Sequence, residues 1–379
     1  MINKLKSIEA VNYFYIGWIM MVFHFCVANS NANTYSTSLV SYIALLFFLS
    51  KIFLQKNYKS TQIVKMIITV VLGFLGYYFS KDMRTFWFSI VLVSFKDVNF
   101  DKTVKYTFIT ILFSCVLFIL LCFMNIIPDT IKASNSNSHS FGLGHPNMCS
   151  AYFTLLTVLY IYLRYHRITY KFLIQDCFFG TLLYFFTKST TGLITLLCIL
   201  LIFLVINRSK NKLRITNIMF VILIFGIFCF TVIPIFYNDS FSILNKLLTG
   251  RLEQAHYYYA KYGIHLFGGN LIEDLTYIYT TTILDIGYMK MLINNGLIYY
   301  LFVVFGCICL LRKAIQNNLN DKVVLITFFL IYMCTENVST YIFMNVSMLL
   351  LSDFIFTSNN IGGVSKWQKK IKDLMRYQS

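Results

Sequence analysis

Long apolar runs separated by short polar turns occupy most of this chain. A helix needs roughly 20 consecutive apolar residues to cross a hydrocarbon core about 30 Å thick. About twelve runs approach that length, several of them short, notably the fourth and the eleventh; they centre on residues 13–28, 37–54, 63–79, 85–95, 106–127, 147–163, 172–187, 191–206, 215–236, 291–311, 323–335 and 338–356. The pattern predicts an all-α fold, that of a polytopic integral membrane protein with about 12 transmembrane helices. We expect residues 1–379 to form a single transmembrane domain.

One long polar interval, from Tyr237 to Asp285, interrupts this pattern. It predicts one large loop between the ninth and tenth helices, over residues 237–290. The interval contains a group of residues suited to acid–base chemistry or to binding anions: Arg251, His256, His265, Glu273 and Asp274. Because apolar helices dominate the rest of the chain, we expect any chemistry to be concentrated in this loop.

Composition and charge agree with a membrane protein. Of the 379 residues, 58% are hydrophobic and 12% are charged, whereas a soluble domain has about 25% charged residues. If the N-terminus is cytoplasmic, 24 of the 32 Lys and Arg residues fall on the inner side, and the outer side is neutral. The positive-inside rule therefore predicts a multi-pass protein of the cell membrane with cytoplasmic N- and C-termini and an extracellular large loop. The net charge of +17 is explained without a nucleic-acid partner.

The two ends of the chain are basic. The N-terminal MINKLKSIEA has two lysines before the first apolar run, and since no cleavage site followed by a soluble domain comes after it, we expect a retained first helix. Residues 364–379 place Trp367, Ile371 and Leu374 among lysines and arginines, which predicts an amphipathic cytoplasmic tail on the anionic inner leaflet. The ten cysteines lie in or beside predicted spans, so we interpret them as packing residues without a redox or metal role.

A second outer loop ends in the sequence Gly142-Leu143-Gly144-His145-Pro146-Asn147, immediately before the sixth helix. Pro146 suits the first turn of a helix, and the glycines permit close backbone approach. His145 and Asn147 have two interpretations: they cap the entrance of a helix, or they contact a sugar at the outer leaflet.

Lys188 and Ser189 begin a polar turn between the seventh and eighth spans, Lys188-Ser189-Thr190-Thr191-Gly192. A lysine at this depth can extend its amine to the interface. A cation beside hydroxyls at a helix N-terminus is equally suited to binding phosphate.

Two further charged residues lie at predicted outer boundaries. Arg84 belongs to a compact Lys81–Arg84 cluster, which is either an interfacial ion-paired group or a site facing an anionic substrate. Glu336 lies between the last two apolar spans. A buried carboxylate is costly there, so we expect it to pair with an outer arginine or lysine.

The large loop combines an arginine with tyrosines. Arg251 offers a fixed fork of donors that fits diphosphate oxygens. Tyr258 is the centre of a three-tyrosine run that either offers faces to sugar rings or forms an interfacial aromatic belt.

Four motifs in this order resemble the Wzy-type polysaccharide repeat-unit polymerases, within the O-antigen polymerase and ligase superfamily. They are Phe141–Asn147 (FGLGHPN), Ser189–Leu193 (STTGL), Thr249–Leu252 (TGRL) followed by Leu266–Gly269 (LFGG), and Glu336-Asn337. Members of the family often have Ser-Arg-Thr-Gly at the second motif, where this chain has Thr190 in place of arginine. Either Lys188 supplies that charge, or Arg251 and Arg84 bind the phosphate alone.

The resemblance implies a glycosyltransferase that polymerises undecaprenyl-diphosphate-linked oligosaccharide repeat units into capsular polysaccharide or exopolysaccharide. An acceptor hydroxyl attacks an anomeric carbon, a base takes its proton, and cations stabilise the departing diphosphate. We assign Arg251 to the diphosphate and His256 or His265 to the base, with Glu273 as the rival base. We expect substrate contacts from Arg84, His145, Asn147, Lys188, Ser189, Tyr258 and Glu336, the last as the residue that orients the base. The reaction needs no cofactor or metal, and its partners are the lipid-linked oligosaccharide, the bilayer, and a separate flippase and chain-length regulator of the same pathway.

Two other classes remain open. A flippase for lipid-linked oligosaccharides has a similar number of helices, but is expected to have buried charges along a pathway and short outer loops. A polysaccharide ligase moves a finished glycan to another acceptor and differs in its product. The chain contains no Walker loop, paired CxxC or HExxH motif, which weakens the case for an ATP-driven pump or a zinc protease.

Overall fold

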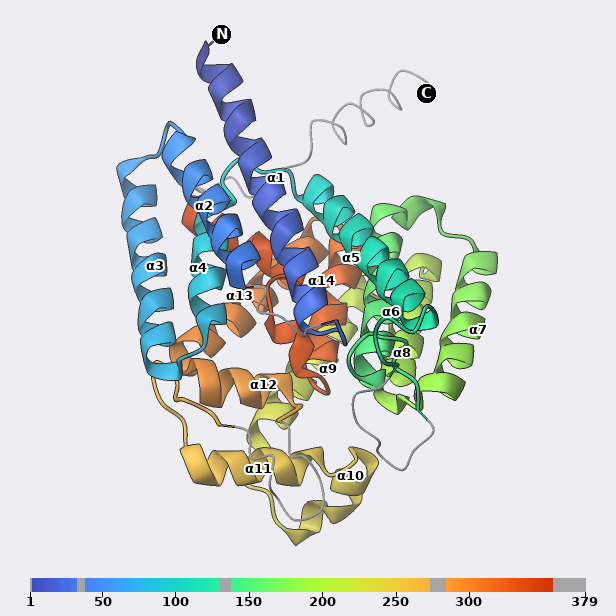
Figure 1. The fold of residues 1–379 in the computed structure, drawn as a ribbon. Helices are drawn as coiled ribbons and strands as arrows, with labels where there is room; N and C mark the ends of the chain where they lie inside the picture. The colour runs from blue at the N-terminus through green and yellow to red at the C-terminus, as the bar shows by residue number, and fades with distance from the viewer. Residues whose placement is uncertain (1, 33–37, 130–137, 273–283, 357–379) are drawn as a thin grey trace.

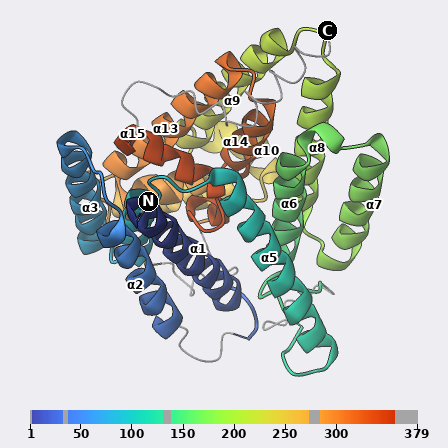
Figure 2. The same cartoon turned by 90° about the horizontal axis from the view of Figure 1, so that it is seen from above.

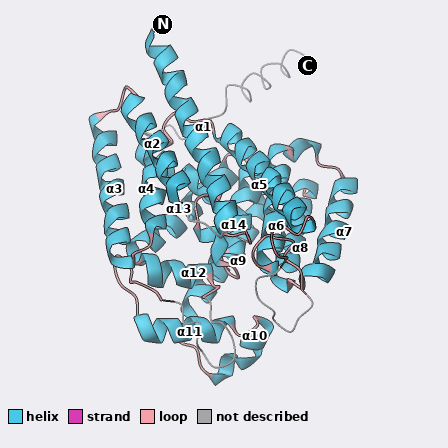
Figure 3. Cartoon of the chain, in the orientation of Figure 1, coloured by secondary structure: helices cyan, strands magenta, loops and turns pink. Residues whose placement is uncertain are grey.

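The computed structural model describes residues 2–32, 38–129, 138–272 and 284–356. These residues form α-helices joined by short turns and 3-10 segments, and the described part of the chain contains no β-strand (Figure 3). The fifteen described α-helices are α1 (Ile2–Ala28), α2 (Ser38–Leu54), α3 (Ser60–Ser80), α4 (Met83–Ser94), α5 (Phe100–Phe123), α6 (Pro146–Leu163), α7 (Tyr170–Thr187), α8 (Thr190–Arg208), α9 (Lys212–Val232), α10 (Ser242–Leu247), α11 (Arg251–Tyr262), α12 (Gly287–Lys290), α13 (Leu297–Gln316), α14 (Asn320–Tyr332) and α15 (Asp353–Phe356). The prediction of an all-α fold is confirmed for the described residues.

Seven of the described helices are long and apolar enough to cross a membrane, and they indicate a multi-pass membrane protein. Their spans are Ala10–Ala28, Ser60–Ser80, Phe100–Phe123, Pro146–Arg167, Thr190–Arg208, Lys212–Val232 and Leu297–Gln316. The sequence predicted about twelve spans. Three of the other predicted spans fall in shorter helices, α2, α4 and α14, and the last falls in a segment made of 3-10 turns (Asn337–Thr340 and Val346–Ser352) and α15. Helix α7 has 18 residues but is not among the seven apolar helices.

The long helices pack side by side as a bundle, and α3 and α7 lie at opposite edges of it (Figures 1 and 2). Both helices have large apolar side chains that are more than half exposed, such as Ile67 on α3 and Ile174 on α7. Exposed side chains of this kind are expected where a helix faces lipid rather than water. The interior contains fully buried aromatic residues, including Trp18, Tyr152 and Phe328.

The bundle has two different ends (Figure 1). Helix α1 begins at one end, here called the N-terminal face, where the turns α2–α3, α4–α5 and α13–α14 also lie. At the other end, here called the α11 face, α10 and α11 lie across the bundle. The polar interval therefore folds as short helices against one end of the membrane bundle. The part that includes Glu273, residues 273–283, lies outside the described residues, as does the predicted tail at 364–379.

Helix α11 is docked through specific contacts at both of its ends. At its start, Thr249 (φ 55°) and Gly250 (φ 83°) make a tight left-handed turn. The Asn245 side chain of α10 then caps α11 by accepting hydrogen bonds from the backbone N–H groups of Leu252 (3.1 Å) and Glu253 (3.2 Å). Since the first N–H groups of a helix have no intrahelical partner, this contact fixes α11 against α10.

Beyond α11, the chain interlocks with the start of α13. The backbone N–H of Leu297 donates to the carbonyl of His265 at 2.9 Å, and that of Ile298 donates to the carbonyl of Leu266 at 3.1 Å. Gly268 (φ 88°) and Gly296 (φ 92°) meet so closely that a Cβ atom on Gly296 would lie 2.2 Å from the Gly268 nitrogen. The predicted Leu266–Gly269 motif therefore has a structural role, because only glycine fits both positions.

The tenth predicted span is broken at its beginning. Helix α12 continues into a π-helical turn, Met291–Asn295, and Gly296 then separates this turn from α13. All residues from Ile286 to Gly296 are buried. The apolar pattern predicted one continuous span at residues 291–311. The positive φ of Gly296 ends that helix and starts α13 in a new direction.

Candidate functional site

A buried ion pair between Arg251 and Glu336 lies where α11 meets the bundle. The Arg251 Nη2 atom is 3.0 Å from Glu336 Oε1, and the exposed fractions of the two side chains are 7% and 9%. The other guanidinium nitrogen, Nη1, donates to the backbone carbonyl of Thr335. The sequence analysis expected Glu336 to pair with an outer cation, and this pairing is confirmed.

Asp285 and Thr191 complete the cluster. Asp285 Oδ2 lies 3.4 Å from Arg251 Nη2, and the Asp285 side chain is 28% exposed. The Thr191 hydroxyl, in the first turn of α8, donates to Glu336 Oε1 at 3.0 Å. Two carboxylates therefore share one guanidinium. Asp285 lies farther from the guanidinium than Glu336 does, and its side chain is more exposed.

The pKa of the Glu336 carboxyl is raised to about 7, chiefly by burial. The Arg251 guanidinium opposes this shift, the Asp285 carboxylate adds to it, and the Thr191 hydrogen bond opposes it. A buried carboxyl with a like charge beside it retains its proton more readily than one in water. A group with a pKa near 7 can exchange a proton at neutral pH, as a general base requires.

Four separate segments build this cluster. Arg251 is the first residue of α11, and it points into the bundle together with Leu252, Ala255 and Tyr258, which share one buried helix face. Glu336 follows the end of α14, where Gly287 packs so closely that a Cβ atom there would be 3.0 Å from the Glu336 carbonyl oxygen. The Gly287 N–H donates to the carbonyl of Met333 at 2.9 Å, which holds Asp285 next to the end of α14.

A second polar cluster lies near the first on the α11 face. Asp82 Oδ1 is 2.5 Å from Arg84 Nε. Asp82 Oδ2 accepts hydrogen bonds from the side-chain amides of Asn294 (2.9 Å) and Asn295 (3.4 Å). Arg84 also donates to the hydroxyl of Tyr341, and its side chain is 45% exposed. Arg84 is therefore ion-paired, as one of its two interpretations predicted, and it is also partly exposed.

The two histidines predicted as alternative bases lie away from the Arg251–Glu336 pair. His256 is five residues after Arg251, about 140° further round a helix with 3.6 residues per turn, and its Nδ1 atom is 2.8 Å from the Pro234 carbonyl oxygen. His265 is exposed, with Nε2 2.9 Å from the carbonyl oxygen of Tyr262. The structure therefore brings Glu336, rather than either histidine, to the arginine. Glu273, the rival base, lies outside the described residues.

Three other predicted substrate contacts have roles at helix ends. His145 Nδ1 accepts a hydrogen bond from the Asn147 backbone N–H at 3.2 Å, so this pair caps the start of α6. The Ser189 hydroxyl is buried and caps α8, accepting from the Gly192 N–H at 3.4 Å. These contacts agree with the helix-entrance interpretation of His145 and Asn147.

Lys188 and Tyr258 differ in accessibility. Lys188 is exposed and ends α7 in a left-handed conformation (φ 54°). Tyr258 is fully buried and its ring stacks on Tyr262 at 6.2 Å. Tyr258 therefore packs α11 against the bundle, and neither ring face is exposed in this structure.

Sequence reasoning missed the roles of Thr191, Asp285 and Asp82 in these clusters. Thr191 belonged to a motif that had been singled out, but Ser189 and Lys188 were preferred within it. A hydroxyl in the first turn of a membrane helix and an acid at the end of a polar loop were the available signals. The partners of these residues lie far away in the sequence, 145 residues in the case of Thr191 and Glu336.

No family model, curated protein or solved structure matches this chain. Within the described residues, no group of three or more His, Cys, Asp or Glu side chains is arranged to hold a metal ion. What the clusters can do must therefore be argued from their geometry.

Proposed function

We propose that the protein is a membrane glycosyltransferase that polymerises undecaprenyl-diphosphate-linked oligosaccharide repeat units at the outer face of the cytoplasmic membrane. The observation that carries this proposal is the buried Arg251, shared by two carboxylates at one end of a membrane bundle. It combines a cation for a diphosphate with a carboxyl that can take a proton.

The distribution of charge supports an outward-facing site. In the described residues, the turns at the N-terminal face carry most of the basic side chains, including the runs at 208–214 and 312–313. The positive-inside rule predicts that this face, with the N-terminus, is cytoplasmic and that the α11 face is outside. In this arrangement the shorter elements α2, α4, α7 and α14 and the final broken segment complete the bundle across the bilayer.

Glu336 acts as the general base in this proposal. The acceptor hydroxyl of one glycan attacks the anomeric carbon of the donor, and Glu336 takes the hydroxyl proton. A new C–O bond forms as the bond between the anomeric carbon and the diphosphate oxygen breaks, and the electron pair leaves with the diphosphate. The role extends the predicted one, in which Glu336 only oriented a base.

Arg251 stabilises the leaving diphosphate. Of its two carboxylate partners, Asp285 is held less closely: its Oδ2 atom is 3.4 Å from Arg251 Nη2, and Glu336 Oε1 is 3.0 Å from the same nitrogen. The Asp285 side chain is also the more exposed of the two. The incoming diphosphate displaces Asp285 and takes its place on the guanidinium fork. Because one anion replaces another, the positive charge of Arg251 always has a negatively charged partner. This exchange avoids the free-energy cost of an unpaired buried charge.

The test is an Arg251→Ala variant in cells that lack the native protein, with Lys246→Ala as the matched control. Lys246 is an exposed cation on α10 in the same polar segment. With equal membrane abundance, Arg251→Ala should leave single repeat units on lipid at the outer face, and Lys246→Ala should restore full polymer length. Normal polymer from Arg251→Ala would contradict the proposal.

The same experiment separates the two other classes. Repeat units that accumulate at the inner face would indicate a flippase. Full-length polymer that stays on its lipid carrier would indicate a ligase, which shares the transfer chemistry but uses a different acceptor.

A further inference from the structure

A cationic groove lies between α9 and α13 at the N-terminal face of the bundle. Its volume is about 480 Å³, and the side chains that line it include Phe220, Ile308, Arg312, Lys313, Gln316 and Asn317. This volume is within the range of roughly 300–1,000 Å³ found for small-molecule sites. The groove is separate from both clusters at the α11 face.

Helices α9 and α13 run antiparallel on either side of the groove. At the N-terminal face, Arg312 Nη1 donates to Asn217 Oδ1 at 2.7 Å. Further along the pair, the hydroxyls of Thr231 and Tyr300 are 2.8 Å apart. The Arg312 guanidinium also lies over the ring of Phe220, 5.6 Å from its centre. These contacts from α9 hold the guanidinium across the mouth of the groove.

The groove is polar at the N-terminal face and apolar further into the bundle. Residues 312–317, at the end of α13, supply its charges and amides. Ile308 lies eight residues before the end of α13 at Gln316. Phe220 lies eight residues after the start of α9 at Lys212. At about 1.5 Å per residue, both are about 12 Å deeper. A phospholipid has the same order, because its headgroup lies at the interface and its acyl chains lie in the hydrocarbon core.

The helices beside the groove expose apolar surface. Val221 and Phe225 on α9 are 65% and 66% exposed, and Phe305 on α13 is 66% exposed. Only three of the 21 residues of α9 are buried. Such surfaces face lipid in a membrane bundle. The acyl chains of a bound lipid can therefore lie along α9 while its headgroup occupies the groove.

The charges of the groove favour an anion. None of the described residues that line it is acidic, and the buried Lys313 Nζ has no hydrogen-bond partner in the described part of the chain. Asp353 attracts this amine and Lys322 repels it, although neither is within hydrogen-bonding distance of the Nζ atom. Arg312 has five N–H donors, and its bond to Asn217 uses one of them. A guanidinium beside an ammonium is suited to binding phosphate oxygens.

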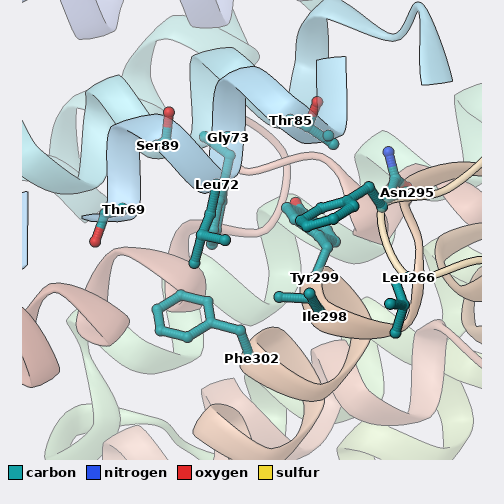
Figure 4. Close-up of a pocket in the computed structure, with 13 residues that line it drawn as sticks. Thr69, Leu72, Gly73, Thr85, Ser89, Leu266, Asn295, Ile298, Tyr299 and Phe302 are labelled. Carbon is teal, nitrogen blue, oxygen red and sulfur yellow. The ribbon is translucent and has the colours of Figure 1, made fainter. Parts of the chain in front are cut away.

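A second cavity, between α3, α4 and α13, shows the contrast (Figure 4). Its volume is about 60 Å³, and none of the described residues that line it is charged. Charge therefore distinguishes the groove beside α9 from this apolar cavity, and charge indicates the class of ligand.

We propose that the groove binds the phosphate of an anionic phospholipid from the inner leaflet. Arg312 and Lys313 contact the phosphate, and Phe220 and Ile308 contact the upper part of an acyl chain. The positive-inside rule predicts that this face is cytoplasmic, and the cytoplasmic leaflet is the anionic one. A soluble phosphate would leave the apolar end of the groove unused. The inference goes beyond the proposed function and requires only the membrane bundle.

A bound lipid would bridge two helices. It would add contacts between α13 and α9, which buries few of its own side chains. Helix α9 leads through α10 to α11, so the lipid would also steady the segment that precedes Arg251.

The test uses the full-length protein in nanodiscs of phosphatidylcholine. The probe is phosphatidylglycerol with a diazirine near its glycerol group, present as a minor component. After illumination, mass spectrometry should find the probe on residues 217–220 and 308–317. Added phosphatidylglycerol should suppress this labelling, and excess soluble glycerol phosphate should not. The same diazirine on phosphatidylcholine should label these residues at most one-fifth as strongly, which corresponds to about 1 kcal/mol.

Matched variants test the two cations. Arg312→Gln and Lys313→Gln should each lower labelling roughly fivefold, because one basic residue near a membrane surface contributes about 1 kcal/mol to binding an anionic lipid. Arg214→Gln is the control, since Arg214 is an exposed cation on α9 that does not line the groove. It should change labelling by less than about twofold.

A second pair tests the shape of the groove and leaves its charges in place. Cys309→Trp fills the groove from α13 and should also lower labelling roughly fivefold. Phe305→Trp places the same side chain on the exposed surface of α13, outside the lining, and should change labelling by less than about twofold.

The inference is overturned if the phosphatidylcholine probe labels the groove as strongly as the phosphatidylglycerol probe. It is also overturned if Arg214→Gln lowers labelling as much as Arg312→Gln, or if Cys309→Trp and Phe305→Trp behave alike. Suppression by glycerol phosphate would assign the groove to a soluble phosphate compound instead. None of these outcomes depends on polymer formation, so failure of this inference and failure of the proposed function are distinguishable.

Discussion

Two buried polar networks lie at opposite ends of the bundle, and they are built on different principles. At the N-terminal face, Lys51 Nζ donates to Gln55 Oε1 at 2.5 Å, and the Gln55 amide donates to Asp97 at 2.7 Å. Nearby, Lys96 donates to the backbone carbonyl of Asn57 at 2.6 Å. At the α11 face, two carboxylates compete for the single guanidinium of Arg251.

The difference separates a network that holds helices together from one suited to chemistry. At the N-terminal face, the Gln55 amide accepts a hydrogen bond from Lys51 and donates one to Asp97, so each charged group has a hydrogen-bonding partner. Such satisfied networks stabilise a fold. At the α11 face, burial raises the pKa of Glu336 to about 7, and the neighbouring Asp285 carboxylate adds to this shift. Shifts of this kind are common at catalytic sites.

The largest effect is expected from Glu336→Gln. The amide keeps the size of the carboxyl but cannot take a proton, so the rate of polymer formation should fall about 1,000-fold. In the native protein the rate should rise as pH increases through about 7, because the base is the ionised carboxylate. The measurement is polymer formation in membranes across pH 5–9. A pH profile unchanged in the variant would remove Glu336 as the base.

The next largest effect is expected from Arg251→Lys. Lysine keeps the positive charge but loses the fork that contacts Glu336, Asp285 and the Thr335 carbonyl together. The rate should fall about 100-fold, comparable to the loss of one transition-state donor. The assay is single-turnover transfer from a purified lipid-linked donor. Full activity with lysine would show that charge alone is sufficient.

Thr191→Val should have a smaller effect, about tenfold, since it removes one hydrogen bond to a charged group. Without this donor the pKa of Glu336 should rise further, and the rising limb of the pH profile should move to higher pH. Thr191→Ser keeps the hydroxyl and serves as the control. Equal rates for Thr191→Val and Thr191→Ser at every pH would show that the Thr191 hydroxyl has no role in the reaction.

Gln55→Leu tests the other network and should affect stability alone. It leaves Lys51 and Asp97 without the amide between them, so the free energy of unfolding should fall by about 1–3 kcal/mol. The transfer rate per folded molecule should stay within about twofold. Thermal unfolding in detergent and the rate assay measure the two quantities on one preparation. A large loss of transfer rate with an unchanged free energy of unfolding would show that the network at the N-terminal face serves the reaction rather than the stability of the fold.

The smallest effect is expected from His265→Ala. The imidazole is exposed and contacts the Tyr262 carbonyl, while the contact that fixes this segment is made by the backbone. The rate should therefore change by less than about threefold. A loss comparable to that of Glu336→Gln would restore His265 as the base.

Local patterns predicted part of this molecule. The apolar runs located the helices, because hydrophobic length is a property of the sequence itself. Arg251 and Glu336 were both singled out, since charged residues are rare at such positions. The burial of Tyr258 could also have been inferred once Arg251 was placed inside, because residues seven apart lie on the same helix face.

The sequence did not predict which residues meet. Arg251 and Glu336 are 85 residues apart, and nothing local indicates that they pair. Similarly, the break at Gly296 depends on its contact with Gly268, which comes from another segment. Contacts between distant segments are set by how helices pack, and this information is spread over the whole chain.

The separation of 85 residues between Arg251 and Glu336 also sets an order of assembly. A chain is synthesised at about 5–20 residues per second, so Glu336 leaves the ribosome roughly 4–17 s after Arg251. During this interval the arginine has no Glu336 to receive it, and α11 cannot complete its docking. In the function that we propose, the newly made protein therefore gains its general base only after its last helices have been inserted.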